Sequence, residues 1–200
     1  LTGVQHIVEA LRAYTHEFTN KLHVILGLLQ LGENKQAEEY VLRLTKTRAH
    51  SISYISERIQ EPSVAALLIG KSYRAAELGI RFVLDPASEL RGDGQYLPAS
   101  SLITILGNLT ENAFDALRSA PENAQKEVTV SIREGEHGML LSVDDSGAGM
   151  AAPQLDRIFE RGFSTKGEGR GTGLSLVKET VDAFGGTIRV ESEPGIGSSF

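Results

Sequence analysis

Two glycine-rich loops constrain the fold of this chain more than any other feature. They run Asp145-Ser-Gly-Ala-Gly149 and Gly169-Arg-Gly-Thr-Gly173, downstream of a helix-like stretch, Asn108-Leu-Thr-Glu-Asn-Ala-Phe-Asp-Ala116. Glycines at every second residue also occur in ordinary turns, so neither loop alone identifies a site. The order and spacing of the three blocks together predict a nucleotide pocket.

Composition excludes several classes of protein. A chain of 200 residues with 40% hydrophobic content can bury a core. A formal net charge of -6 argues against a general nucleic-acid binder, so any site for a polyanion must be local. The absence of cysteine excludes disulfides and thiolate metal sites.

The chain also lacks the signature of a membrane segment. No stretch approaches the roughly 18 consecutive apolar residues of a spanning helix, and the start has no signal-peptide pattern. We therefore expect no membrane contact by this stretch itself. Because it begins at Leu1 and stops inside a strand-like run at Phe200, we expect a fragment of a longer protein, truncated at its C-terminal end.

The N-terminal part predicts a helical hairpin. A polar Thr15 interrupts a seam of apolar residues spaced alternately by four and three: Val4, Val8, Leu11, Phe18, Leu22, Ile25 and Leu29. Gly32-Glu-Asn34 breaks this helix, and a second one continues to Glu61-Pro62, where proline is expected to end it. Two helices make a thin core, so residues 1–61 are expected to form a homodimer with a four-helix bundle.

Residues 62–200 predict a second domain with helices on one face of a mixed sheet. The expected helices are Val64–Leu78, Ser100–Leu117 and Leu174–Phe184. The expected strands are Ile80–Leu84, Glu127–Arg133, Met139–Val143 and a terminal hairpin of Gly186–Glu193 with Gly197–Phe200.

The first glycine loop is a candidate for the base of the nucleotide. An adenine amine needs a fixed acceptor, which Asp145 can supply at the end of a strand. Gly147 and Gly149 would permit close approach of the backbone to the base. The alternative is a plain turn capped by Asp144 or Asp145.

The helix before it carries a polar stripe. Asn108, Glu111, Asn112 and Asp115 recur at steps of three and four, which places them close together on one face. An Asn carbonyl suits Mg²⁺, which prefers oxygen ligands and retains waters. Asn112 is therefore the candidate metal contact, and a solvated face of an ordinary helix is the alternative.

The second glycine loop is a candidate for the phosphates. Gly169, Gly171 and Gly173 lead into a helix beginning near Leu174, whose N-terminal N–H groups favour an anion. The preceding stretch, Phe159–Glu168, has little apolar periodicity and is expected to be a mobile lid. Lys166 and Arg170 could neutralise phosphate charge there, and a solvated surface loop is the alternative.

These motifs carry a family resemblance. Asn108 to Asp115 resembles the N box of sensor histidine kinases, Asp145 to Gly149 and Gly169 to Gly173 their glycine boxes, and Phe159 to Phe163 their F box. His16-Glu-Phe-Thr-Asn20 and the residues after it are most similar to bacterial sensor kinases for citrate and C4-dicarboxylates.

The resemblance implies an α+β architecture. The dimerising hairpin would precede a Bergerat-type α/β sandwich, the ATP-binding fold of histidine kinases and gyrase-like ATPases. It also implies ATP and Mg²⁺ as cofactors, and it makes this chain the cytoplasmic portion of a bacterial inner-membrane receptor. The implied nucleotide contacts are Asn108, Asn112, Asp145, Gly147, Gly149, Lys166, Gly169, Arg170, Gly171, Thr172, Gly173 and Leu174.

The resemblance implies His16 as the phosphoacceptor, with the phosphate passed to an aspartate of a response-regulator receiver domain. His23, seven residues on, occupies the equivalent position beside the apolar seam and competes with it. Glu17 would hydrogen-bond the imidazole. Asn20 shares the helix face of His16 and would orient water for phosphatase activity.

Two departures bear on the activity. Gyrase-like ATPases carry a water-activating Glu where this chain has Asn108, which favours transfer over hydrolysis. Asp115 stands where many histidine kinases carry a basic residue, so its role stays open. The first alternative is a dimeric scaffold that binds nucleotide without catalysis. The second is a gyrase-like ATPase, which Asn108 disfavours.

Overall fold

The computed structural model describes residues 19–45, 50–91, 96–118, 120, 124–136, 138–163 and 171–200. The chain divides into two compact units, Leu1–Ala49 and His50–Phe200, and each is described by itself. In these described ranges, no helix combines the length and the apolar character needed to cross a membrane.

The described residues of the first unit form two helical segments joined by a short turn. Residues 19–30 are helical, and α2 spans Asn34–Thr45. Gly32 has a φ of 76°, its N–H donates to Leu29 C=O, and Glu33 N–H donates to Leu28 C=O. This is a Schellman motif, which requires a left-handed residue just past the helix end. The predicted break at Gly32 is therefore confirmed.

The helices around Pro62 differ from the expectation. α3 spans His50–Arg58, and α4 spans Pro62–Glu77. The Glu61 carboxylate accepts a hydrogen bond from Val64 N–H at 2.7 Å, so Glu61 caps α4. Pro62 thus begins a helix, where its missing N–H costs nothing, and does not end the one before it.

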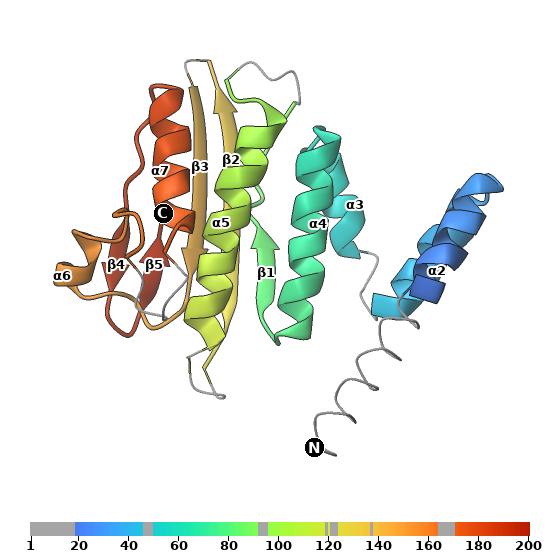
Figure 1. The fold of residues 1–200 in the computed structure, drawn as a ribbon, viewed down its shortest axis with the longest axis horizontal. Coiled ribbons are helices and arrows are strands. Elements are labelled where there is room, and N and C mark those ends of the chain that lie inside the picture. The colour runs from blue at the N-terminus through green and yellow to red at the C-terminus, as the bar shows by residue number, and fades with distance from the viewer. Residues whose placement is uncertain are drawn as a thin grey trace, which may run out of the picture. The chain divides into compact units, whose positions relative to one another are not determined.

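The second unit contains one five-stranded sheet of order β1-β2-β3-β5-β4 (Figure 1). β1 pairs parallel to β2, and the other neighbours pair antiparallel. The strands are β1 Arg81–Leu84, β2 Glu127–Gly135, β3 Gly138–Asp145, β4 Glu191–Glu193 and β5 Gly197–Ser199. The two central strands are longer than expected, and the terminal hairpin is shorter.

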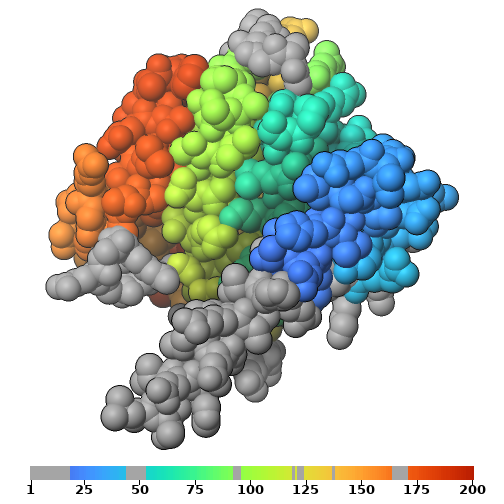
Figure 2. Space-filling view, turned by 45° about the vertical axis from the view of Figure 1, so that its right-hand side comes forward, coloured from blue at the N-terminus to red at the C-terminus, as the bar shows by residue number. Residues whose placement is uncertain are grey.

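Helices cover one face of this sheet. α4, α5 (Ala99–Arg118) and α7 (Gly173–Ala183) lie side by side over it (Figures 1 and 2). Val128, Val130 and Ile132 of β2 are fully buried in the core, whereas Leu140 of β3 is 63% exposed. The alternation is that of a sheet with only one face packed against helices. The expected α+β architecture is confirmed.

The helix α3 contributes to the same core. Ile55 and Ile59 are buried there with exposed fractions of 3% and 1%, although the sequence pattern assigned them to the hairpin. Where the dimerising hairpin ends and the catalytic domain begins, at Pro62 or earlier, stays a prediction.

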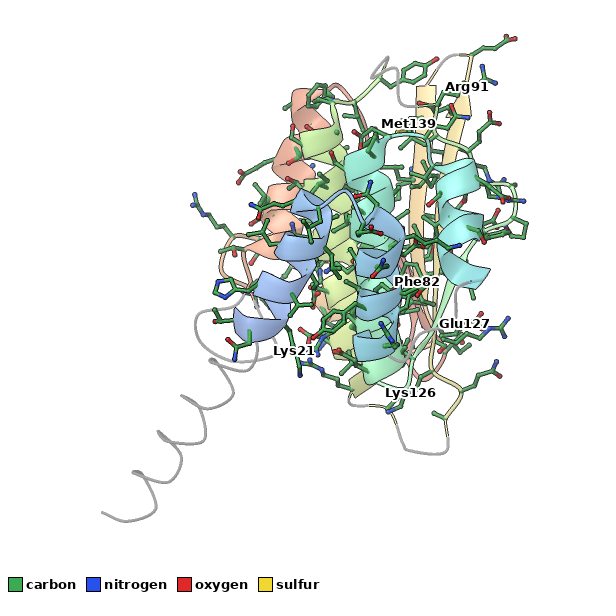
Figure 3. All side chains as sticks on the ribbon, turned by 90° about the vertical axis from the view of Figure 1, so that its right-hand side faces the viewer. Lys21, Phe82, Arg91, Lys126, Glu127 and Met139 are labelled. Atoms are coloured by element: carbon green, nitrogen blue, oxygen red, sulfur yellow. The ribbon has the colours of Figure 1, made fainter. Side chains whose placement is uncertain are left out.

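The strand register shows at which end of the sheet β3 terminates. Val128 pairs with Asp145, and Glu134 pairs with Met139. Glu127 and Met139 mark the two opposite ends in Figure 3. The loop after Asp145 therefore lies at the Glu127 end, and a short helix, α6 (Ala152–Leu155), follows it.

Candidate nucleotide site

The first glycine loop folds tightly around Asp145. Gly147 N–H donates to Asp145 Oδ1 at 2.8 Å. Gly147 is buried, and a Cβ there would lie 2.9 Å from Ala116 Cβ of α5. The carboxylate thus caps its own turn, which is the role that the alternative of a plain turn gave it. A carboxylate has about four lone-pair sites, so accepting this hydrogen bond is compatible with accepting another from an adenine amine.

A side chain that sequence reasoning missed anchors this loop to the sheet. Ser146 Oγ donates to Gln125 C=O at 2.8 Å and accepts from Glu127 N–H at 2.9 Å. Its partners lie 19 to 21 residues away in the chain. No local pattern marks such a contact, because it depends on the strand register.

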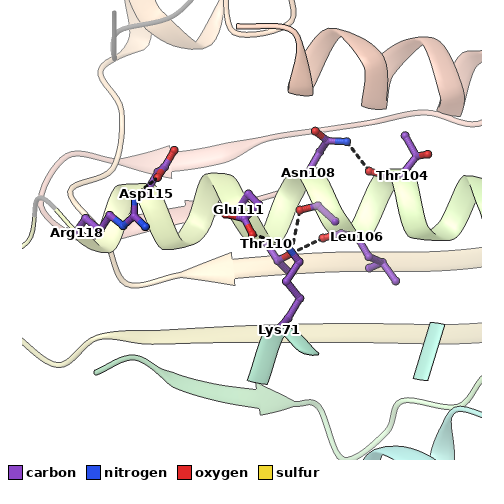
Figure 4. Close-up of polar contacts among 9 residues, drawn as sticks. Lys71, Thr104, Leu106, Asn108, Thr110, Glu111, Asp115 and Arg118 are labelled. Atoms are coloured by element: carbon purple, nitrogen blue, oxygen red, sulfur yellow. Dashed lines mark hydrogen bonds and ion pairs between the residues drawn. The ribbon is translucent and has the colours of Figure 1, made fainter. Parts of the chain in front are cut away.

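The polar side chains of the predicted stripe on α5 have different partners. Asn108 Nδ2 donates to Thr104 C=O at 2.7 Å. Glu111 is instead directed toward α4, where its Oε1 lies 2.5 Å from Lys71 Nζ (Figure 4). Asp115 Oδ1 lies 3.4 Å from Arg118 Nη1. The four positions therefore share one side of α5, but the Glu111 carboxylate is paired with Lys71.

The side chain of Asn112 has an unsatisfied donor. Its Nδ2 is buried and has no hydrogen-bond partner among the described residues. Leaving a buried donor unpaired costs about 1–3 kcal/mol. An acceptor from outside the chain, such as a phosphate oxygen, would satisfy it. The amide oxygen is a hard ligand of the kind Mg²⁺ takes. Asn112 therefore fits both members of a magnesium nucleotide.

The start of α7 lies close to this helix. A Cβ at Gly173 would be 2.9 Å from Asn108 Oδ1. The Thr172 side chain makes no capping hydrogen bond, which leaves N–H groups of the first turn for a ligand. Leu174 packs against the core behind it. The site thus combines an anion-binding helix end with the amides of α5.

The backbone of the F box also contacts the second glycine loop. Gly162 N–H donates to Gly171 C=O at 3.0 Å. Gly171 has a φ of 111°, and a Cβ there would lie 2.5 Å from Phe163 C=O. The Arg157 guanidinium lies 4.5 Å from the centre of the Phe163 ring. These contacts join the F box to the second glycine loop.

Several predicted residues lie outside the described part of the chain: His16, Glu17, Lys166, Gly169 and Arg170. Asn20 and His23 are exposed on the helix of residues 19–30. No group of three or more His, Cys, Asp or Glu side chains among the described residues could hold a metal ion. A metal here would depend on an Asn ligand, on phosphates and on water.

The family follows from comparison with known proteins. Residues 98–200 match the sequence profile of the histidine kinase-, DNA gyrase B- and HSP90-like ATPases, and residues 2–57 match the α-helical domain of SpoOB-type sensor kinases. The chain belongs to the histidine kinase-, DNA gyrase B- and HSP90-like ATPase family. Its second unit therefore contains an ATP-binding domain, as the glycine loops predicted.

The curated relatives are sensor kinases. The sensor histidine kinase DcuS of Escherichia coli K12 is 45% identical over the whole chain. The sensor protein CitS of Halalkalibacterium halodurans is 43% identical over 96% of the chain. A probable C4-dicarboxylate sensor kinase of Bacillus subtilis is 35% identical over the whole chain. The chain spans only 36–37% of the length of these relatives. The resemblance inferred from the motifs is confirmed.

Solved structures support the same fold. The crystal structure of full-length ShkA in complex with AMPPNP matches 96% of this chain and 44% of its own, with a TM-score of 0.55 and 26% identity. The mycobacterial sensor histidine kinase MprB matches 69% of this chain and 90% of its own, with a TM-score of 0.52 and 23% identity.

Proposed function

We propose that this chain is the catalytic core of an ATP-dependent protein-histidine kinase. The single observation that carries the proposal is the buried, unpaired Nδ2 of Asn112 on α5, the helix that also approaches Gly147 through Ala116 and Gly173 through Asn108. An anion-binding helix end, an unpaired buried donor and a strand-end carboxylate together suit a nucleoside triphosphate.

Each part of the nucleotide has a candidate partner. Asp145 would accept the adenine amine, with Gly147 and Gly149 letting the backbone come close. The phosphates would meet the second glycine loop, Thr172 and the start of α7, with Lys166 and Arg170 contributing charge. Asn112 would provide an oxygen ligand for Mg²⁺, which when bound would neutralise charge on the phosphates.

The site favours transfer over hydrolysis. Asn108 stands where gyrase-like ATPases carry a water-activating Glu. Its amide donates to Thr104 C=O and so is held against its own helix. An amide has no basic function with which to activate water. We therefore assign the γ-phosphate to a protein acceptor, His16, whose ring nitrogen would be hydrogen-bonded and oriented with help from Glu17. His23 is the competing acceptor.

The exposed apolar side chains of the helix of residues 19–30 support a homodimer. Leu22, Val24, Leu26 and Leu29 are 44–52% exposed. Leu22, Leu26 and Leu29 lie on one side of the helix, and a second copy would cover them in a four-helix bundle of the kind expected for residues 1–61.

The relatives suggest the role of the longer protein. We infer that it is an inner-membrane receptor for a small carboxylate such as citrate or a C4-dicarboxylate, with this chain as its cytoplasmic portion. The phosphate would pass to an aspartate of a response-regulator receiver domain. Asn20, exposed on the same helix as His23, would orient the water that hydrolyses the aspartyl phosphate of that partner.

Calorimetric titration of ATP, with Mg²⁺ and then with a chelator, tests the nucleotide site. The parent chain should bind Mg²⁺-ATP and lose about tenfold or more in affinity without the metal. Asn112→Ala should bind weakly in both conditions. Glu111→Gln is the matched control and should bind as the parent does, because Glu111 pairs with Lys71. Unchanged, metal-dependent binding by Asn112→Ala would refute this assignment.

A further inference from the structure

The C-terminal hairpin, defined here as residues 191–199, lies directly against the first glycine loop. Gly195 N–H donates to Ala148 C=O at 2.7 Å. Met150 N–H donates to Ser192 Oγ at 2.8 Å. Asp145 pairs with Ser198 where β3 meets β5. The hairpin therefore contacts this loop at its beginning, middle and end.

A single hydroxyl, that of Ser192, joins the loop to the turn of the hairpin. Ser192 Oγ accepts from Met150 N–H and donates to Gly197 C=O at 2.9 Å. It also lies 3.0 Å from Ser198 Oγ. Removing the hydroxyl would leave the Met150 N–H and the Gly197 C=O without this shared partner.

The packing between the two segments leaves no room for adjustment. A Cβ at Gly149 would collide with Glu193 C=O, and a Cβ at Gly197 would collide with Asp145 C=O. Close backbone contact of this kind means that a shift of the hairpin displaces the loop as well.

We propose that Ser192 is a positioning residue for the adenine base, acting through the backbone of Ala148 to Met150. This inference rests on the proposed function, because it needs Asp145 to receive the base. The carboxylate accepts from the adenine amine only in a narrow range of distance and angle. Guanine carries a carbonyl at the corresponding ring position, so a displaced loop weakens ATP binding more than GTP binding.

The test compares the parent chain with three purified variants of the whole chain. Ser192→Ala removes the hydroxyl, and Ser192→Thr retains it. Ser198→Ala is the matched control, because it removes a neighbouring hydroxyl whose loss leaves the Met150 hydrogen bond in place. Ser192→Cys, which keeps the side-chain volume with a much weaker hydrogen-bonding group, replaces the alanine variant if that variant does not fold. Calorimetry gives the Kd of ATP and GTP well below each Tm, and amide exchange follows Met150 without nucleotide.

We expect Ser192→Ala to weaken ATP binding by about fivefold to tenfold and to lower the preference for ATP over GTP. Exchange at Met150 should rise, while Ser192→Thr and Ser198→Ala stay within about twofold of the parent. Equal weakening in Ser192→Ala and Ser198→Ala would overturn the inference. So would unchanged binding by Ser192→Ala alongside faster exchange. If the parent bound no nucleotide, the proposed function would fail first, and this inference with it.

Discussion

The helix of residues 19–30 and the pocket of the second unit differ in what they leave without a partner. The helix exposes about half of the surface of Leu22, Leu26 and Leu29. The second unit buries its large apolar core residues almost completely, and Leu106 and Val130 are 0% exposed. Among the buried polar side-chain atoms of its described residues, Nδ2 of Asn112 is left without a hydrogen-bond partner.

The difference indicates two kinds of partner. Apolar area is covered without directional requirements, and another protein surface is large enough to cover a helix face. A buried donor in a glycine-lined site needs one acceptor at one place, which a small polar ligand provides. The contrast supports the proposals that the first unit mediates association and that the second binds a nucleotide.

The largest expected effect comes from placing a charge on the helix of residues 19–30. Leu29→Glu should raise the Kd of the dimer by about 1,000-fold, since each dimer loses two buried leucines worth roughly 2 kcal/mol apiece. Gln30→Glu adds the same charge at the next, polar position and should leave the dimer intact. Sedimentation equilibrium measures both. A parent chain that is monomeric at micromolar concentration would contradict the comparison itself.

A change at the base of the pocket should have the next largest effect. Asp145→Asn should weaken ATP binding by about 100-fold, because an amide replaces the charged acceptor for the adenine amine. Asp144→Asn is the control, since Asp144 accepts from Ser199 on the adjacent strand. Titration with ATP distinguishes them, and equal losses in both variants would remove the special role of Asp145.

The smallest of the three effects is a difference in unfolding free energy between two glycine variants, which separates close packing from backbone strain. Gly149 and Gly195 both have positive φ, but only at Gly149 would a Cβ meet backbone atoms. Alanine at either position should cost about 1–2 kcal/mol of unfolding free energy, and Gly149→Ala about 2 kcal/mol more. Urea denaturation gives the two values. Equal losses of unfolding free energy in the two variants would mean that the first glycine loop can move away from the C-terminal hairpin.

Much of this molecule follows from its sequence because the relevant signals are local. Alternating apolar residues identified the two central strands, and spacing of three and four residues identified α5. The positive φ of Gly32, Gly149 and Gly171 matches the expectation for glycines in tight turns. The ATP-binding domain was predictable because the glycines and polar residues of its motifs lie in short contiguous blocks.

The rest depends on contacts between distant segments. Ser146 and Ser192 are ordinary serines in sequence, and the second reaches its partner 42 residues away. The pairing of Glu111 with Lys71 of α4 likewise depends on the packing of two helices and has no local signal in the sequence. For Pro62 a local signal did exist, since an acidic residue before a proline is typical of a helix start.

The central claim is that the chain phosphorylates its own His16 from ATP. The direct measurement is incubation with Mg²⁺ and γ-labelled ATP, following acid-labile, base-stable label on the parent and on His16→Gln and His23→Gln. We predict label on the parent and on His23→Gln and none on His16→Gln. ATP binding without label on any of the three would contradict the claim and favour a nucleotide-binding scaffold.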